Sequence, residues 1–314
     1  MRKYIARQII SLLITLLLVS LIIYTIFSII PGDPVTLLSG VSASQEQIEV
    51  LREKLGLDQN LFERYVTWMK GALTADFGNS IQYSIPVKDL VWDRLVVTSS
   101  LALLSIIIVL LISFPLGILS AYFNNKFLDK FISNTVVLGL SIPNYFLGIL
   151  LIWVFGIILK SFMPGEFVHY SKNVIQYWKS LFFPALAVSI PCISMMTKFI
   201  RTSILGQFRQ DYVRTAKSKG GTQRHILFKH IIRNSIIPIF TLLGMIIADI
   251  LSGSIITEQV FSIPGIGRLL IGGINSRDFP VVITLVVYIS FLIVVINFLV
   301  ELLVRLNDPR IRRG

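Results

Sequence analysis

The chain has 314 residues, of which 54% are hydrophobic and 15% are charged, with a formal net charge of +12 at pH 7. Charged residues make up about 25% of soluble domains, so this composition excludes an ordinary soluble domain. The hydrophobic residues form long blocks and the basic residues stand between them, a pattern that indicates membrane topology and not nucleic-acid binding.

Six apolar stretches are long enough to cross a hydrocarbon layer about 30 Å thick, which takes roughly 20 helical residues. The first follows a basic N-terminus, as in a signal peptide, but it is longer than the roughly 7–15 residues of a signal-peptide core and no A-x-A site follows it. The sequence therefore predicts an all-α integral membrane protein with six transmembrane helices. They are expected near residues 9–30, 95–122, 131–159, 181–200, 236–257 and 280–304.

The distribution of lysine and arginine predicts the orientation of these helices. Basic residues are concentrated in the N-terminal tail, the loop 123–130, the loop 201–235 and the C-terminal tail. Because basic loops remain on the cytoplasmic side, both termini are predicted to be cytoplasmic. Lys198 and Arg201, at the inner end of the fourth stretch, can reach the interface by snorkelling.

The loop 31–94, predicted to lie outside, carries two helical patterns. Ser44 and Gln47 fit a capping box before an apolar run that Gly56 ends. A second amphipathic run follows, with an apolar face of Phe62, Tyr65, Trp68 and Met69. The loop is either a helical cap resting on the membrane domain or a docking surface for an outer partner, and it can be both.

The loop between the fourth and fifth stretches predicts a pair of short helices. Asp211 is expected to cap the first, which runs through Lys219 and ends at Gly220-Gly221. Thr222 is expected to cap the second, which runs to about Arg233, before a proline opens the fifth stretch. A basic helix pair attached to two spans can transmit force from a soluble partner, or it can lie on anionic lipid.

The fifth stretch holds an ionisable residue near its middle. Inserting such a residue costs about 2.5–3.5 kcal/mol, so Asp249 is a functional candidate by default. Ser252 and Gly253 follow three and four residues later and are expected on the same helical face. This small polar face either lines a translocation path or packs closely against another helix.

The sequence contains no recognisable catalytic constellation. It has no G-x-x-x-x-G-K-[ST] phosphate-binding loop, and its three histidines form no metal-binding pattern. The single cysteine, Cys192, excludes an internal disulfide. We therefore expect a protein that is not an enzyme and holds no cofactor or metal, and any energy for transport comes from another subunit or from an ion gradient.

Seven short motifs, in order along the chain, carry a family resemblance. They are Pro31-Gly32-Asp33-Pro34, Asp76-Phe77-Gly78-Asn79-Ser80, Pro86-Val87 with Arg94 and Thr98, Ser141-Ile142-Pro143-Asn144, Glu258 to Arg268, Arg277 to Val282, and Asp308 to Arg312. With them the chain resembles, almost end to end, the membrane subunits of bacterial binding-protein-dependent ABC importers of the dipeptide, oligopeptide and nickel branch. The resemblance implies the type I importer permease fold in the bacterial inner membrane.

The same resemblance gives the inner helix pair a role, as the segment that docks into a groove on the ATPase. Ala216 and Gly220 match the family pattern E-A-A-x-x-x-G, whereas Arg214 and Thr215 depart from it. The family's Ile-x-Leu-Pro ending is also absent from this chain. The expected coupling residues are Asp211, Ala216, Gly220, Gly221, His230 and Arg233.

The resemblance further implies the organisation of the chain and its partners. The expected parts are an N-terminal tail and first helix (1–30), an extracytoplasmic helical loop (31–94), a permease core (95–304) with a coupling segment (206–235), and a cytoplasmic tail (305–314). The expected partners are a homologous second permease that supplies the other half of the path, two ATP-binding subunits, an extracytoplasmic solute-binding protein and the lipid bilayer.

The cargo implied by the resemblance is a di- or oligopeptide. The same machinery importing nickel, a metal chelate or another cationic solute is an alternative, which the acidic Asp249 favours. A gradient-driven secondary transporter is a second alternative and predicts a chain that transports without any ATPase.

Overall fold

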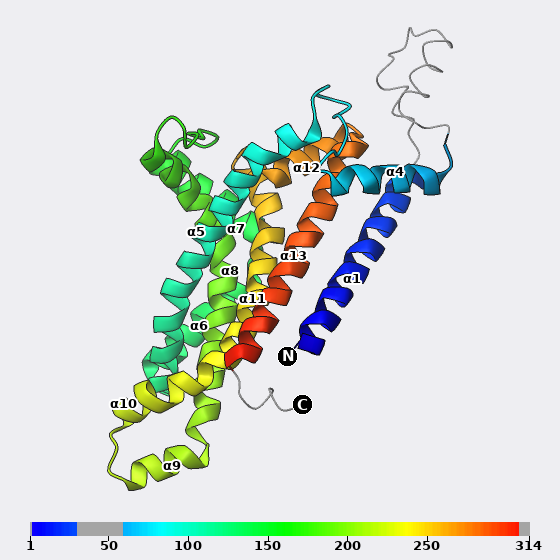
Figure 1. Cartoon of the computed structure of the whole chain (residues 1–314). Coiled ribbons are helices and arrows are strands. Elements are labelled where there is room, and N and C mark those ends of the chain that lie inside the picture. Colours follow the sequence, from blue (N-terminus) through cyan, green and yellow to red (C-terminus); the bar gives the residue numbers. More distant parts are fainter. Residues whose placement is uncertain (1, 30–58, 308–314) are drawn as a thin grey trace, which may run out of the picture. The chain divides into compact units, whose positions relative to one another are not determined.

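The computed structural model describes residues 2–29 and 59–307, and its long elements are helices (Figure 1). The predicted capping box at Ser44 and Gln47 and the helix end at Gly56 lie outside the described residues. The chain forms two compact units, Met1–Val97 with Pro264–Val295, and Thr98–Ile263 with Ile296–Gly314.

Five helices in the described part of the chain are long and apolar enough to cross a membrane. They confirm five of the six predicted stretches, and several extend beyond the apolar residues because polar side chains cap or continue them. Their bounds are α1 (Arg2–Ile29), α5 (Val87–Tyr122), α8 (Val174–Phe208), α11 (Ile232–Val260) and α13 (Phe279–Asn307).

The remaining predicted stretch, 131–159, is not one continuous helix. It consists of α6 (Phe127–Ser141), α7 (Asn144–Leu151) and the π-helical turn η1 (Ile152–Ile158), and the axis bends by 99° between α6 and α7. Ile142, which precedes Pro143, is extended, with φ −100° and ψ 122°. A residue before proline avoids the α region, so the chain leaves the helix here. The two halves together form a sixth candidate span.

Helix α8 occupies the centre of the second unit. It contacts α6, α7 and α11, and a hydrophobic cluster of the second unit includes its buried Met196, Ile200 and Ile204. Ser189, also on α8, is fully buried and donates to the carbonyl oxygen of Ala185 at 2.6 Å, so its hydroxyl is satisfied within the helix. Because α8 contacts these three helices and contributes to this cluster, the hydrophobic core of the second unit is built around α8.

In the first unit, α4 (Leu61–Leu73) lies across one end of α1 (Figure 1). Tyr65, Trp68 and Met69 pack in one cluster with Tyr24, and the Tyr65 hydroxyl is 2.9 Å from the Ser20 hydroxyl. This confirms that the predicted amphipathic helix rests on a membrane helix. Phe62 does not take part, since its side chain is 70% exposed.

The first unit also contains a buried carboxylate that joins two of the sequence motifs. Asp278, in the turn between α12 (Ile266–Asn275) and α13, accepts a hydrogen bond from the Ser80 hydroxyl. It also accepts from the backbone N–H groups of Ile81 and Gln82, each at 3.1 Å. These bonds fix the segment before α5 against the start of α13.

Candidate functional site

The predicted inner helix pair is present at one end of the second unit. Helices α9 (Asp211–Ser218) and α10 (Gln223–Ile226) lie at the end of α8 opposite the segment 159–173 (Figure 1). The N-cap of α9 is Gln210, so the prediction that Asp211 caps this helix is wrong by one residue. Asp211 is instead the first helical residue, where its charge favours the positive end of the helix dipole.

A glycine turn separates the two helices, as predicted. Gly220 has φ +80°, in the left-handed region that favours glycine. The N–H of Gly221 donates to the carbonyl oxygen of Ala216 at 3.1 Å, and a Cβ on Gly221 would lie 2.9 Å from that oxygen. Thr222 caps α10 by accepting from the N–H of His225 at 3.3 Å, which confirms that prediction.

The second helix of the pair does not end near Arg233. Helix α10 continues through the π-helical turn η2 (Leu227–Ile231) directly into α11, and the junction residues Leu227 and Ile232 are both helical. The proline expected to open the fifth span, Pro238, lies inside α11. The prediction placed a helix end near Arg233 because polar residues interrupt the hydrophobic pattern at that point. Polar residues alone do not end a helix, and this one continues.

The helix pair has one buried and one exposed face. Val213, Ile226, Leu227 and Ile231 are buried in the same cluster as α8 and α11. The other face forms a shallow hollow with an exposed aromatic ring at Phe228 and basic side chains beside it. The hollow is lined by Thr222, Arg224, His225, Phe228 and Lys229.

The two predicted end residues of the coupling segment differ in accessibility. The His230 side chain is half-buried in η2, whereas the Arg233 side chain is exposed near the start of α11. Phe228 was not among the predicted coupling residues, although it is 57% exposed. An aromatic residue between Arg224 and Lys229 is the signal that identifies this face.

A buried ion pair, not predicted from the sequence, stands where α6 begins. Asp129 accepts hydrogen bonds from the Ser120 hydroxyl at 2.5 Å and from the backbone N–H of Asn125 at 2.8 Å. Its partner is the Arg201 guanidinium of α8, which also donates to Asn124 at 3.1 Å. Arg201 is therefore held by Asp129, a contact that the sequence analysis did not predict.

The three path candidates on α11 do not share one face. Asp249 and Ser252 are exposed, and so are Met245 and Ile256. In chain order, Met245, Asp249, Ser252 and Ile256 follow one another at spacings of four, three and four residues. These four residues form a continuous stripe along the helix, here called the α11 stripe. Gly253 instead faces α7, where a Cβ would lie 2.5 Å from the amide nitrogen of Asn144.

A second pair of motif residues meets inside the second unit. The buried Glu258, near the end of α11, accepts a hydrogen bond from the Thr98 hydroxyl of α5 at 2.6 Å. This bond joins the two helices across 160 positions of sequence. As with Asp278, a carboxylate from one motif is held by a hydroxyl from another.

Comparison with known proteins agrees with these motifs. Residues 113–313 match the family described as binding-protein-dependent transport system inner membrane component, and residues 1–102 match the corresponding N-terminal family. The chain is 35% identical over 314 residues to the oligopeptide transport system permease protein AppB of Bacillus subtilis, covering 99% of both chains.

Two further relatives match over similar lengths. The chain is 34% identical over 312 residues to a probable peptide ABC transporter permease protein of Sinorhizobium fredii, covering 99% of this chain and 100% of the relative. It is 32% identical over 312 residues to the glutathione transport system permease protein GsiC of Escherichia coli, covering 99% of both chains.

Proposed function

This chain belongs to the family of binding-protein-dependent transport system inner membrane components, and we propose that it forms half of the peptide path of an ATP-driven importer. It is the membrane permease component of an ABC transporter and not its catalytic subunit. Three relatives are named for peptide, oligopeptide and glutathione transport, which supports a peptide as the cargo.

The observation that carries the proposal is the unbroken helix from α10 to Asp249. It runs through η2 into α11, and at 1.5 Å per residue the distance from Gln223 to Asp249 is roughly 40 Å. A displacement of α10 is therefore carried to the α11 stripe along one continuous helical segment, through the π-helical turn η2 and past Pro238. Both ends of α10–α11 are packed on α8, so α8 moves with them.

Two exposed surfaces of the second unit are assigned one partner each. One of two ATP-binding subunits contacts the hollow around Phe228, where Arg224 and Lys229 favour an acidic groove with an apolar centre. This end of the second unit then faces the cytoplasm. A homologous second permease covers the α11 stripe, and the path runs between the two copies of this stripe.

The solute-binding protein is assigned to the opposite membrane face. The loop 31–94 is its proposed receiver, and within this loop the exposed Phe62 of α4 is an available anchor.

For the basic helix pair α9–α10, the alternative to an ATP-binding subunit is a surface of anionic lipid. In that case its charges would not affect ATP hydrolysis.

A cationic cargo such as nickel is the second candidate, favoured by the carboxylate of Asp249 on the α11 stripe. The described residues hold no group of three His, Cys, Asp or Glu side chains placed to bind a metal ion. A recognition of nickel by this chain would therefore depend on a chelating ligand or on the partner permease.

The test is a reconstituted complex of this chain with its second permease, ATP-binding subunits and binding protein. Labelled peptides and Ni²⁺ are offered to proteoliposomes in the presence and absence of ATP. Uptake of peptides only with ATP supports the proposal. Uptake of Ni²⁺ alone contradicts the peptide cargo, and uptake by this chain without ATP supports a secondary transporter.

A further inference from the structure

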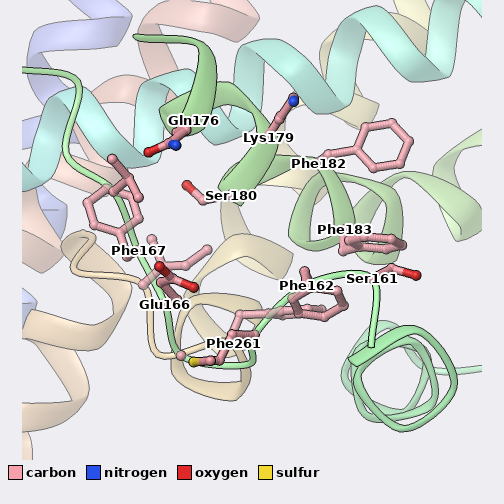
Figure 2. A pocket seen from close by; sticks show the side chains of 14 residues that line it. Ser161, Phe162, Glu166, Phe167, Gln176, Lys179, Ser180, Phe182, Phe183 and Phe261 are labelled. Carbon is pink, nitrogen blue, oxygen red and sulfur yellow. The ribbon is translucent and has the colours of Figure 1, made fainter. Parts of the chain in front are cut away.

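A pocket lies at the end of the second unit opposite α9, between the segment 159–173 and the first turns of α8 (Figure 2). Its cavity volume is about 390 Å³. One wall is aromatic, with the rings of Phe162 and Phe183 stacked at a centroid distance of 4.6 Å and Phe261 6.3 Å from Phe162. A cavity of this size holds one or two residues of a peptide and not a long chain.

The opposite wall of the pocket presents hydrogen-bond acceptors. Glu166 follows a tight turn in which Gly165 has φ +84°, and this turn returns the chain toward α8. Figure 2 shows the Glu166 carboxylate between Phe167 and Phe261, and Ser180 also lines the pocket. Ser180 donates its hydrogen to the carbonyl oxygen of Tyr177 at 2.7 Å, so its lone pairs remain to accept.

The carboxylate of Glu166 has no ion pair or side-chain hydrogen bond among residues 2–29 and 59–307. Lys179 also lines the pocket, but Figure 2 shows its amine directed away from Glu166. An unpaired carboxylate beside aromatic faces attracts a cation with several N–H donors, because the ring faces are negative as well. The same wall takes an apolar side chain.

A free peptide amino terminus combines both requirements, since it places an ammonium group one carbon from its first side chain. We propose that this pocket binds the amino-terminal residue of a peptide, with Glu166 accepting from the ammonium group and Phe162 and Phe183 contacting the first side chain. The proposal rests on the function proposed above and assigns a specificity site to this chain. An acetylated terminus has no charge and would lose the Glu166 interaction.

The test compares uptake of Phe-Ala-Ala with that of its N-acetylated form by the reconstituted complex. Because the binding protein is identical in every sample, a change in the ratio of the two uptake efficiencies comes from this chain. Glu166→Gln is expected to reduce the preference for the free terminus about tenfold, the lower end for a hydrogen bond to a charged group. The control Asp93→Asn, an exposed carboxylate outside the pocket, should leave the ratio unchanged.

A second variant examines the aromatic wall. Phe162→Ala should reduce the preference for Phe-Ala-Ala over Gly-Ala-Ala several-fold without changing the response to acetylation. Removing the ring takes away the stacked contact with Phe183 and part of the apolar surface. An unchanged preference between the two peptides would contradict the assignment of this wall to the first side chain.

Direct binding separates failure of the pocket from failure of the transport function. Both forms of the tripeptide are titrated against the purified chain in nanodiscs. Tighter binding of the free form, lost in Glu166→Gln, supports the pocket even if the complex takes up no peptide. Equal binding of both forms overturns it. If Glu166→Gln weakens only the binding protein's affinity for the complex, the occupant is a protein segment and the peptide assignment is wrong.

Discussion

Arg201 donates two hydrogen bonds to the carboxylate of Asp129, from Nε to Oδ1 at 2.7 Å and from Nη2 to Oδ2 at 2.9 Å. The Asp129 side chain is 4% exposed and that of Arg201 is 27% exposed. The pair joins α8 to the start of α6 close to where α8 carries α9. We therefore expect a movement of α9 to reach α6 as well as α11.

Removing the guanidinium leaves a buried carboxylate without its counter-charge. We expect Arg201→Leu to destabilise the protein by about 3–5 kcal/mol, as for other broken buried pairs. Thermal unfolding of the purified complex measures this as a lower midpoint. The matched control is Arg214→Leu, since Arg214 pairs with Asp211 at 3.6 Å while both side chains are at least 80% exposed. An exposed pair contributes about 0–1 kcal/mol, so equal effects would contradict the structural role of Asp129.

The positive φ of Gly220 makes the turn between α9 and α10 sensitive to side chains. Gly220→Val should uncouple ATP hydrolysis from peptide uptake while membrane insertion is retained, because a β-branched residue is strained at this φ. Gly220→Asn should be milder, since asparagine tolerates the left-handed region. Uptake per ATP hydrolysed is the measurement.

The control for the turn is Gly206→Ala on α8, where a Cβ meets no atom within 4 Å. This substitution should be neutral or slightly stabilising. Normal uptake per ATP in Gly220→Val would show that the turn has no part in coupling.

The continuity of α10, η2 and α11 predicts the effect of a one-residue insertion. An alanine inserted after Asn234 rotates Asp249 by about 100° relative to α10. We expect the insertion to abolish ATP-driven uptake while the complex still assembles. The control Asn234→Ala changes the same exposed position without changing the helical register, and it should retain uptake above half of the wild-type rate. If the insertion has as small an effect as this substitution, α11 does not transmit the movement as one rigid helix.

The α11 stripe predicts a charge-dependent effect of Asp249. Asp249→Asn removes a negative charge from the proposed path, so uptake of a lysine-containing peptide should fall more than uptake of a neutral one. The ratio of the two uptake rates is the measurement, and Ser252→Ala is the control on the same stripe. Full uptake of every peptide by Asp249→Asn would reduce Asp249 to a packing residue.

Much of the fold follows from the sequence because hydrophobic blocks of membrane length leave few alternatives. The glycine turn and the Thr222 cap also follow, since their chemistry is local. The break after α6 does not, because Pro115, Pro184 and Pro191 remain inside helices whereas Pro143 does not. Tertiary packing decides which proline ends a helix.

The candidate site was predicted less completely than the fold, because its contacts are also decided by tertiary packing and not by local sequence. Asp129 and Arg201 are 72 positions apart, and no local pattern pairs them. Gly253 follows Asp249 by four residues, which at about 100° per residue is one turn plus about 40°. This offset places Gly253 against Asn144 instead of on the exposed stripe. The motif residues Thr98 and Glu258 were identified, whereas their contact was not.

The measurement that tests the central claim most directly is peptide uptake into proteoliposomes that contain the complete complex, with wild-type chain or with Gly220→Val. We predict uptake that requires ATP and both classes of partner subunit with the wild-type chain. With Gly220→Val, ATP hydrolysis should continue and uptake should be lost. Uptake by the isolated chain, driven by an ion gradient and unaffected by ATP or by this substitution, would contradict the account.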